Sequence, residues 1–218
     1  MGDEGCVKYT AEHTRGAAIA HPLWPVLNNA RTQLYDLGLI GVYPNGIGFG
    51  NLSIRTAGDE FLISGTATGA KRELSPDEYC LVRSCDIEGN RVVSRGPIQA
   101  SSESMSHGAI YRACPKAAAV IHIHSKAVFG GMLGDDLLST PKEAAYGTPE
   151  MARAISNAVG QSGNSHGQIV LAGHDEGVIT WGASIDEALA LALKLYNKYN
   201  GLVREPGQWV IKEKRQGV

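Results

Sequence analysis

The sequence predicts an α/β protein in which helices cover the faces of a central sheet. Segments with helical periodicity stand before, between and after several short segments rich in β-forming residues, and this order predicts helices packed on a sheet. The chain has 218 residues, 43% of them hydrophobic, so it can bury a full core. That length favours a single domain over residues 1–218, with a core at about 20–203 and short tails at both ends.

Four segments have the pattern of helices. Apolar residues recur every three or four positions in the first, and the later ones begin with residues that cap helices well. In the last segment, Ser184 and Glu187 form a capping box ahead of a long apolar face. The predicted helices lie in residues 21–38, which end at Gly38, 101–115, which begin with serine and end at Pro115, 148–159, which begin with Thr148 and Pro149, and 184–200.

The segments between these helices predict strands. They are short, punctuated by glycine, and rich in β-branched and aromatic residues. The last of them has the pattern of two strands around a tight turn. The predicted strand segments are residues 46–55, 60–64, 79–84, 117–124 and 168–182.

Composition excludes two classes of partner. The formal net charge is −2, with lysine and arginine spread along the chain, so no basic surface for nucleic acid is expected. No apolar run approaches the roughly 18 residues that span a bilayer, and the N-terminus is polar, so we expect no membrane segment and a cytoplasmic protein. The cysteines form no C-x-x-C pair and are expected to be reduced, buried thiols: Cys6, Cys80, Cys85 and Cys114.

Two histidines stand one residue apart in the apolar segment AVIHIHS, residues 119–125. Alternate side chains of a strand share one face, with Cα atoms roughly 6–7 Å apart, so His122 and His124 can converge on one ion. A metal site and two separately hydrogen-bonded core histidines are about equally compatible with this pair.

A third metal ligand could come from His174 in the turn GHDEG. Three neutral imidazoles leave coordination positions open on Zn²⁺, Mn²⁺ or Fe²⁺, as a catalytic metal requires. Spacing favours His174 only narrowly over the other histidines. These are His13, His21, His107 and His166.

Four motifs, in this order, resemble the class II aldolase/adducin family over residues 25–200. They are GNLSIR at 50–55, SSE at 101–103, the His-x-His strand at 122–124 and the later histidine in a hairpin at 174. The resemblance implies a three-layer α/β/α fold with a mainly antiparallel central sheet. It also implies a homotetramer with active sites at subunit interfaces.

The resemblance implies that His122, His124 and His174 bind a divalent metal ion, Zn²⁺ before Mn²⁺ or Fe²⁺. It makes Glu103 the acid/base, because substrate oxygens can displace a carboxylate from the ion and free it to move a proton. The ion would stabilise the enediolate formed when a C–C bond breaks. Without the motif, Glu103 would be interpreted as an ordinary first-turn glutamate of a helix.

The same resemblance implies a phosphate pocket made of backbone N–H groups and hydroxyls. As isolated residues, its glycines and serines would be interpreted as turn residues. The matching residues are Gly50, Asn51, Ser101 and Ser102, with either Thr66 or the pair Thr68 and Gly69 from the loop SGTATGA, which is longer than usual in the family.

Two further features depart from the family pattern. The turn GHDEG places Asp175 and Glu176 beside the presumed ligand, and these charges disfavour a highly anionic substrate there. The segment between His124 and Tyr146 is shorter than in many family aldolases and lacks the tyrosine that protonates the leaving fragment. Tyr146 itself matches the aromatic-Gly-Thr turn before the next helix. The metal site is therefore better supported than a particular reaction.

These observations predict a metal-dependent aldolase that cleaves or forms a C–C bond in a small hydroxy-carbonyl substrate, expected to be a sugar phosphate. A sugar-phosphate epimerase or a decarboxylase would use the same metal site, and an iron-dependent oxygenase would use the same histidines. A non-catalytic adducin-like binding protein would keep the fold, but it has no need of an open metal site.

Overall fold

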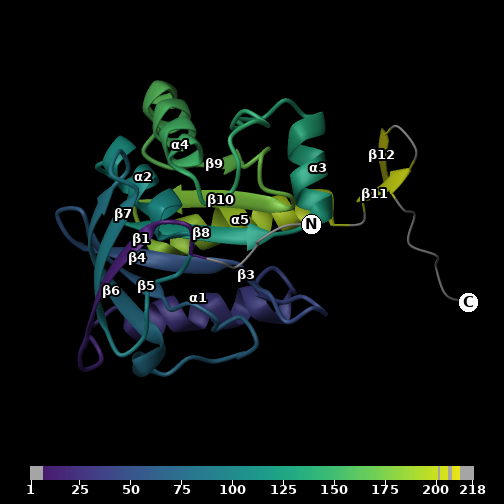
Figure 1. The fold of residues 1–218 in the computed structure, drawn as a ribbon. Coiled ribbons are helices and arrows are strands. Elements are labelled where there is room, and N and C mark those ends of the chain that lie inside the picture. The colour runs from purple at the N-terminus through teal and green to yellow at the C-terminus, as the bar shows by residue number, and fades with distance from the viewer. Residues whose placement is uncertain (1–6, 201, 206–207, 212–218) are drawn as a thin grey trace, which may run out of the picture.

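The computed structural model describes residues 7–200, 202–205 and 208–211 of the chain. Its main feature is an eight-stranded sheet with the order β1-β7-β6-β5-β4-β8-β10-β9 (Figure 1). Adjacent strands are antiparallel except β1 and β7, which are parallel. The strands are β1 (Thr10–Arg15), β4 (Asn51–Ala57), β5 (Glu60–Ser64), β6 (Tyr79–Asp86), β7 (Arg91–Gly96), β8 (Ala119–His124), β9 (Gly167–Val170) and β10 (Gly177–Gly182).

Helices cover both faces of this sheet. One core cluster contains the apolar residues of α2 and α4, and the other contains those of α1, α3 and α5. In the view of Figure 1, α4 lies above the strands and α1 below them. The fold is therefore the predicted three-layer α/β/α arrangement with a mainly antiparallel sheet. The helices are α1 (Trp24–Asp36), α2 (Ser104–Ala113), α3 (Lys126–Gly134), α4 (Pro149–Ser162) and α5 (Ile185–Tyr199).

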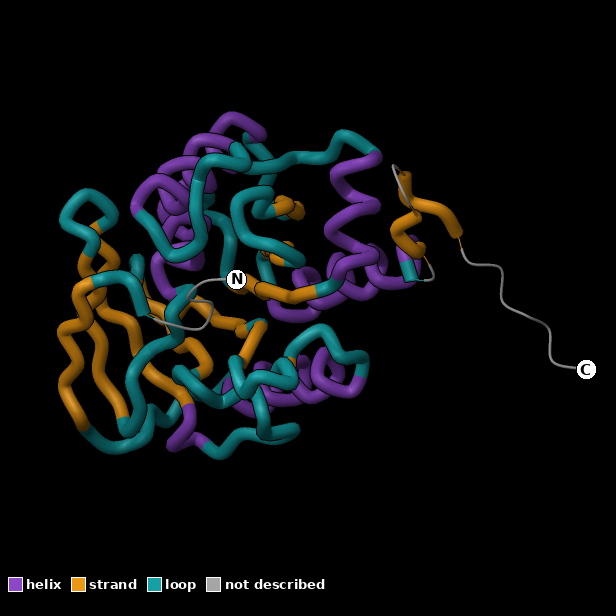
Figure 2. The backbone as a smooth tube through the Cα atoms, turned by 45° about the vertical axis from the view of Figure 1, so that its right-hand side comes forward, coloured by secondary structure: helices purple, strands orange, loops and turns teal. Residues whose placement is uncertain are grey.

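Three small elements complete the described chain. The hairpin of β2 (Gly41–Val42) and β3 (Gly48–Phe49) leads into β4, and a 3₁₀ turn η1 (Pro76–Glu78) leads into β6. A second hairpin, β11 (Leu202–Glu205) and β12 (Gln208–Ile211), follows α5. Figure 2 shows this hairpin at the side of the domain, beyond α3.

The helix ends follow the predicted signals with small differences. Thr148 caps α4 by accepting a hydrogen bond from the Met151 N–H, and Ser184 caps α5 in the same way. The Glu187 carboxylate accepts from the N–H of Ala183, one residue before the position that would close the capping box. In α2, Glu103 occupies the N-cap position instead of a serine, because Ser101 accepts the Glu103 N–H within the preceding turn.

Several elements were not predicted from the sequence, among them β1, β7 and α3. Thr10–Arg15 forms the edge strand β1, so the sheet begins before residue 20. Its side chains are almost all exposed, which is why the segment has the composition of a tail. Helix α3 is short and contains Gly130 and Gly131, which lower helix propensity.

The cysteines agree with the expectation of buried thiols. Cys80 and Cys114 are buried and Cys85 is half-buried, whereas Cys6 lies outside the described residues. Burial raises the pKa of Cys80 to about 11, so this thiol stays protonated at neutral pH. In the described part of the chain, every helix is too short or too polar to cross a bilayer. The basic C-terminal tail from residue 212 lies outside the described residues.

Candidate metal centre

Three imidazoles meet where β8 ends beside the start of β10. His124 pairs with Gly177 and His122 with Ile179 in the antiparallel register. The intervening turn places His174 next to them, because its N–H donates to Leu171 and its carbonyl accepts from Gly177. The ring centroids of the three histidines are 4.7 to 5.2 Å apart.

The three histidines could hold one metal ion. One ligand nitrogen from each of His122, His124 and His174 lies within 4.8 Å of the other two. All three rings are buried, and neither nitrogen of His122 has a hydrogen-bond partner among the described residues. A buried imidazole without a hydrogen bond is costly unless another partner compensates it. The site therefore fits a divalent ion that prefers nitrogen ligands.

Burial also sets the charge of these rings. Loss of solvation lowers the pKa of His122 and His124 well below the usual value, and the neighbouring imidazoles lower it further. Burial lowers the pKa of His174 to about 3, with a smaller contribution from Lys8. At neutral pH the three rings are uncharged, so each has a nitrogen lone pair to offer a metal.

Gly177 is needed where the imidazoles pack. A Cβ at this position would lie 2.6 Å from Cδ2 of His174 and 3.2 Å from Nε2 of His122. The first distance is too short for any larger residue. The glycine that begins β10 therefore allows His174 to reach the strand histidines.

The competing histidines lie elsewhere. His107 is buried in α2, with its Nδ1 2.7 Å from the hydroxyl of Ser53, and His13 lies against Ser94. His21 accepts the Leu23 N–H, and His166 is exposed near Glu187. Within the described residues, only His122, His124 and His174 form a cluster that could bind a metal.

The imidazoles line a cavity of about 290 Å³. The structure brings all the sequence-predicted site residues to this cavity, although they come from β4, β8 and the segments next to β3, β5, α2 and β10. Besides the three histidines, these residues are Glu103, Gly50, Asn51, Thr66, Thr68, Gly69, Ser101 and Ser102. A cavity of this size accepts a small molecule.

The polar side chains of the cavity differ in burial and in hydrogen bonding. Glu103 is 3% exposed at the start of α2, beside Ser102. Asn51 is buried, and its side-chain oxygen has no hydrogen-bond partner among the described residues. The Thr68 hydroxyl donates to the carbonyl of Gly65, so it closes its own loop. Thr66 is half-buried, so both candidate threonines reach the cavity but in different environments.

Gly50 connects the β2–β3 hairpin to the cavity. Its φ is +74°, a left-handed conformation that favours glycine. A Cβ here would also lie 2.7 Å from the side chain of Ile40. This backbone geometry brings Asn51 into the cavity at the first position of β4.

Two tyrosines of the site were not predicted as site residues. The Tyr146 ring stacks on His174 with centroids 4.4 Å apart, and its hydroxyl donates to Ser102 at 2.9 Å. The Tyr43 hydroxyl lies 2.8 Å from Nδ1 of His124. The aromatic-Gly-Thr pattern at Tyr146 was a usable signal, whereas nothing local to Tyr43 connects it to His124, 81 positions away.

Comparison with known proteins finds one matching family model and several matching solved structures. The model of the class II aldolase and adducin N-terminal domain matches residues 45–197. No curated protein sequence matches the chain.

Several solved structures share the fold. The L-fuculose-1-phosphate aldolase of Thermus thermophilus is 23% identical, with a TM-score of 0.58 over 82% of this chain and 91% of that one. Another L-fuculose 1-phosphate aldolase is 20% identical, with a TM-score of 0.60 over 92% and 95%. YgbL of Klebsiella pneumoniae is 17% identical, with a TM-score of 0.59 over 81% and 86%. Because the family model spans well over half of the chain, the protein belongs to the class II aldolase and adducin family.

Proposed function

We propose that the protein is a metal-dependent aldolase acting on a small hydroxy-carbonyl substrate. One observation carries the proposal: three buried, neutral imidazoles share a cavity with the buried carboxylate of Glu103. A divalent ion held by His122, His124 and His174 would supply a Lewis acid for negative charge that develops on substrate oxygens. A protein that serves only as a scaffold has no use for such a set of groups.

Glu103 is the proposed proton carrier. Aldol cleavage removes a proton from the hydroxyl next to the breaking C–C bond and delivers one to the carbon that is released. The carboxylate of Glu103 can accept the proton from the hydroxyl and later donate it to the carbon. The Tyr146 ring stacks on His174 and would shield that side of the imidazole from water.

A phosphate group on the substrate would be bound by uncharged donors. The cavity is lined by no lysine or arginine side chain within the described part of the chain. Hydroxyl, amide and backbone N–H groups are available from Asn51, Thr66 and Ser102, and the N-terminus of α2 adds favourable partial charge. The donor set therefore fits one small anion.

An epimerase or decarboxylase is the second candidate. The structurally similar YgbL is described as a candidate for aldolase, epimerase and decarboxylase activity. The same metal site and Glu103 would support each of these reactions, because all three build negative charge next to a carbonyl group. Product identification separates them: aldehyde release supports the aldolase, and carbon dioxide release supports the decarboxylase.

The proposal includes Zn²⁺ as the ion and a homotetramer as the assembly. Elemental analysis of the purified protein measures the first. Light scattering measures the second, with four chains of 23.1 kDa expected per particle.

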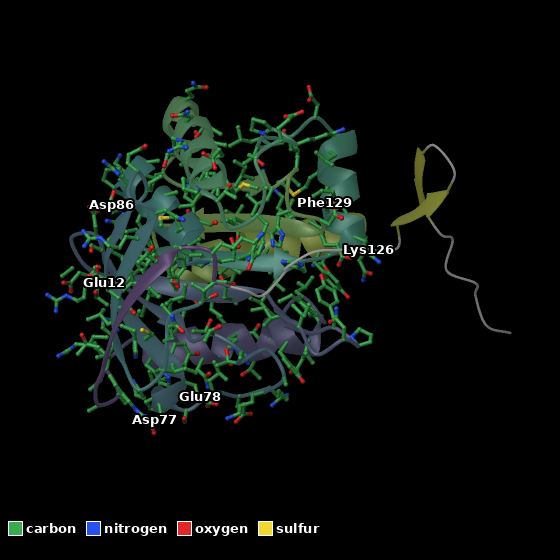
Figure 3. The ribbon with its side chains drawn as sticks, viewed as in Figure 1. Glu12, Asp77, Glu78, Asp86, Lys126 and Phe129 are labelled. Atoms are coloured by element: carbon green, nitrogen blue, oxygen red, sulfur yellow. The ribbon has the colours of Figure 1, made fainter. Side chains whose placement is uncertain are left out.

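The central test combines a substrate screen with substitution of Glu103. Ketose phosphates and their unphosphorylated counterparts are screened for aldehyde release. Glu103→Gln keeps the shape of the side chain but removes the base, so kcat should fall by roughly 10²–10⁴-fold while the melting temperature changes little. Glu12→Gln, at an exposed position of the edge strand β1, is the matched control and should keep full activity (Figure 3). Near wild-type turnover in Glu103→Gln would contradict the assignment.

A further inference from the structure

We propose that Glu176 and Tyr43 form a positioning relay that fixes the tautomer and orientation of His124. The Tyr43 hydroxyl lies 2.8 Å from Nδ1 of His124 and donates to Oε2 of Glu176 at 3.2 Å. Tyr43 follows β2, and Glu176 lies in the turn before β10, so the relay joins two separate segments at one ring. The inference rests on the proposed function, because it assigns a role to these residues in metal binding.

The arrangement of donors and acceptors specifies the direction of the hydrogen bonds. An ionised carboxylate only accepts, so the Tyr43 O–H proton points to Glu176. The Tyr43 oxygen then accepts a hydrogen bond from His124, which requires a proton on Nδ1 of that ring. With Nδ1 protonated, the lone pair of neutral His124 lies on Nε2. The relay thereby selects which nitrogen can bind a metal.

The position of Tyr43 is itself fixed by the hairpin. Its N–H donates to the Ile47 carbonyl at 2.8 Å, and its carbonyl accepts from Gly46 at 2.8 Å. The ring packs on Phe49 with centroids 4.4 Å apart, and Phe49 packs on His124 at 5.5 Å. These contacts restrict the movement of the hydroxyl relative to the imidazole.

Glu176 is held in an unusual conformation. Its φ is +66°, a left-handed value that costs free energy for a residue other than glycine. Its carbonyl accepts from the N–H of Ser125, directly after His124, and its second carboxylate oxygen lies 3.5 Å from Lys126. Figure 3 shows Lys126 at the start of α3. The side chain makes contacts here that glycine could not make.

The relay gives a role to one of the two extra carboxylates of the turn GHDEG, that of Glu176. Glu176 is mostly buried, with 21% of its side chain exposed, and it is engaged by Tyr43 and Lys126. Asp175, its neighbour, is exposed. The two acidic residues therefore differ in environment, which provides a matched control within one turn.

The first experiment measures Zn²⁺ binding by the metal-free, full-length protein in competition with a chromogenic chelator. Tyr43→Phe removes the hydroxyl that contacts both His124 and Glu176, and Glu176→Gln removes the charge that orients this hydroxyl. Each variant should raise the dissociation constant about 10-fold or more. The double variant should bind about as weakly as the weaker single variant, because both residues act through one ring. Asp175→Asn should leave the constant within about twofold of the wild-type value.

Glu176→Gly separates the relay from a structural role. Glycine accepts the positive φ but has no carboxylate, so the melting temperature should stay at or above the wild-type value while Zn²⁺ binding weakens. If the melting temperature fell together with the Zn²⁺ affinity, Glu176 would act only by supporting the turn, and this result would overturn the proposal.

The second experiment observes the tautomer directly in the metal-free protein. Nitrogen NMR of the ¹⁵N-labelled protein should show His124 protonated at Nδ1 in the wild type, with that preference reduced in Tyr43→Phe. A proton on Nε2 in the wild type, or unchanged Zn²⁺ affinity in Tyr43→Phe, would overturn the relay. Failure of the wild-type protein to bind Zn²⁺ would instead contradict the proposed function, and the tautomer measurement would still decide for or against the relay.

Discussion

Burial keeps the three histidines of the candidate metal centre uncharged, and it does the same for His107, which lies outside that centre. His107 is completely buried in α2, and its Nδ1 lies 2.7 Å from the Ser53 hydroxyl. Its Nε2 has no hydrogen-bond partner among the described residues. Burial lowers its pKa from 6.5 to about 3, so it is neutral over the physiological range.

This burial predicts a loss of stability in mild acid. Between pH 6.5 and about 3, the unfolded chain binds a proton at His107 and the folded protein does not. The free energy of unfolding should therefore fall as pH decreases below about 6.5, by up to about 1.4 kcal/mol per pH unit from this residue. His107→Asn keeps a polar atom near the position of Nδ1 but does not titrate. The pH dependence of the free energy of unfolding should therefore become smaller by up to about 1.4 kcal/mol per pH unit. Urea unfolding at several pH values measures it, and an unchanged slope would contradict the prediction.

At the scale of elements, helix α1 supports the loop that borders the cavity. Arg31 is 1% exposed and donates from Nη1 to the carbonyls of Lys71 and Arg72, at 2.6 and 3.0 Å. Its Nη2 donates to the carbonyl of Thr68 at 2.9 Å. The guanidinium therefore holds three carbonyl groups of this loop at once through its planar set of donors.

Replacing Arg31 should weaken both this loop and anion binding. Arg31→Met leaves three carbonyls without their donor, so the free energy of unfolding should fall by about 2–3 kcal/mol. Inorganic phosphate should also compete less well with substrate, because Thr68 and Gly69 lose their support. Arg31→Lys keeps the charge but only part of the hydrogen bonding, and should give an intermediate result. Wild-type stability in Arg31→Met, measured by urea unfolding, would contradict this account.

At the scale of the whole molecule, the candidate site joins segments that are distant in the sequence. The cavity is lined by the β2–β3 hairpin, the loop after β5, the start of α2, the end of β8 and the turn before β10. An ion bound by His122, His124 and His174 would link the last two of these segments. Binding to the folded state alone stabilises a protein by mass action.

Zn²⁺ should therefore raise the melting temperature. At a free concentration 100 times the dissociation constant, the gain is about 2.7 kcal/mol, or about 5–10 °C for a chain of this length. The double variant His122→Ala, His124→Ala should lose this shift, whereas His166→Ala, at an exposed position away from the cluster, should keep it. Differential scanning calorimetry with and without Zn²⁺ provides the measurement. An equal shift in the double variant would rule out these ligands.

Local patterns in the sequence determined most elements of the fold. The alternation around His122 and His124 predicted their shared face, because strand side chains repeat every two residues. Thr148 marked the start of α4 through its own hydroxyl. Such signals depend on neighbouring residues alone, so they can be recognised without the tertiary structure.

Contacts between distant segments were decided by the tertiary structure alone. Thr10–Arg15 is polar and becomes a strand because β7 provides an edge to pair with. Tyr146 meets Ser102 across 44 positions, and Tyr43 meets Glu176 across 133. The sequence determined the residue types, the helices other than α3, most strands and the histidine pair, since these depend on local spacing. Which side chains surround each imidazole depends on how the loops and layers pack, and only the folded chain brings them together.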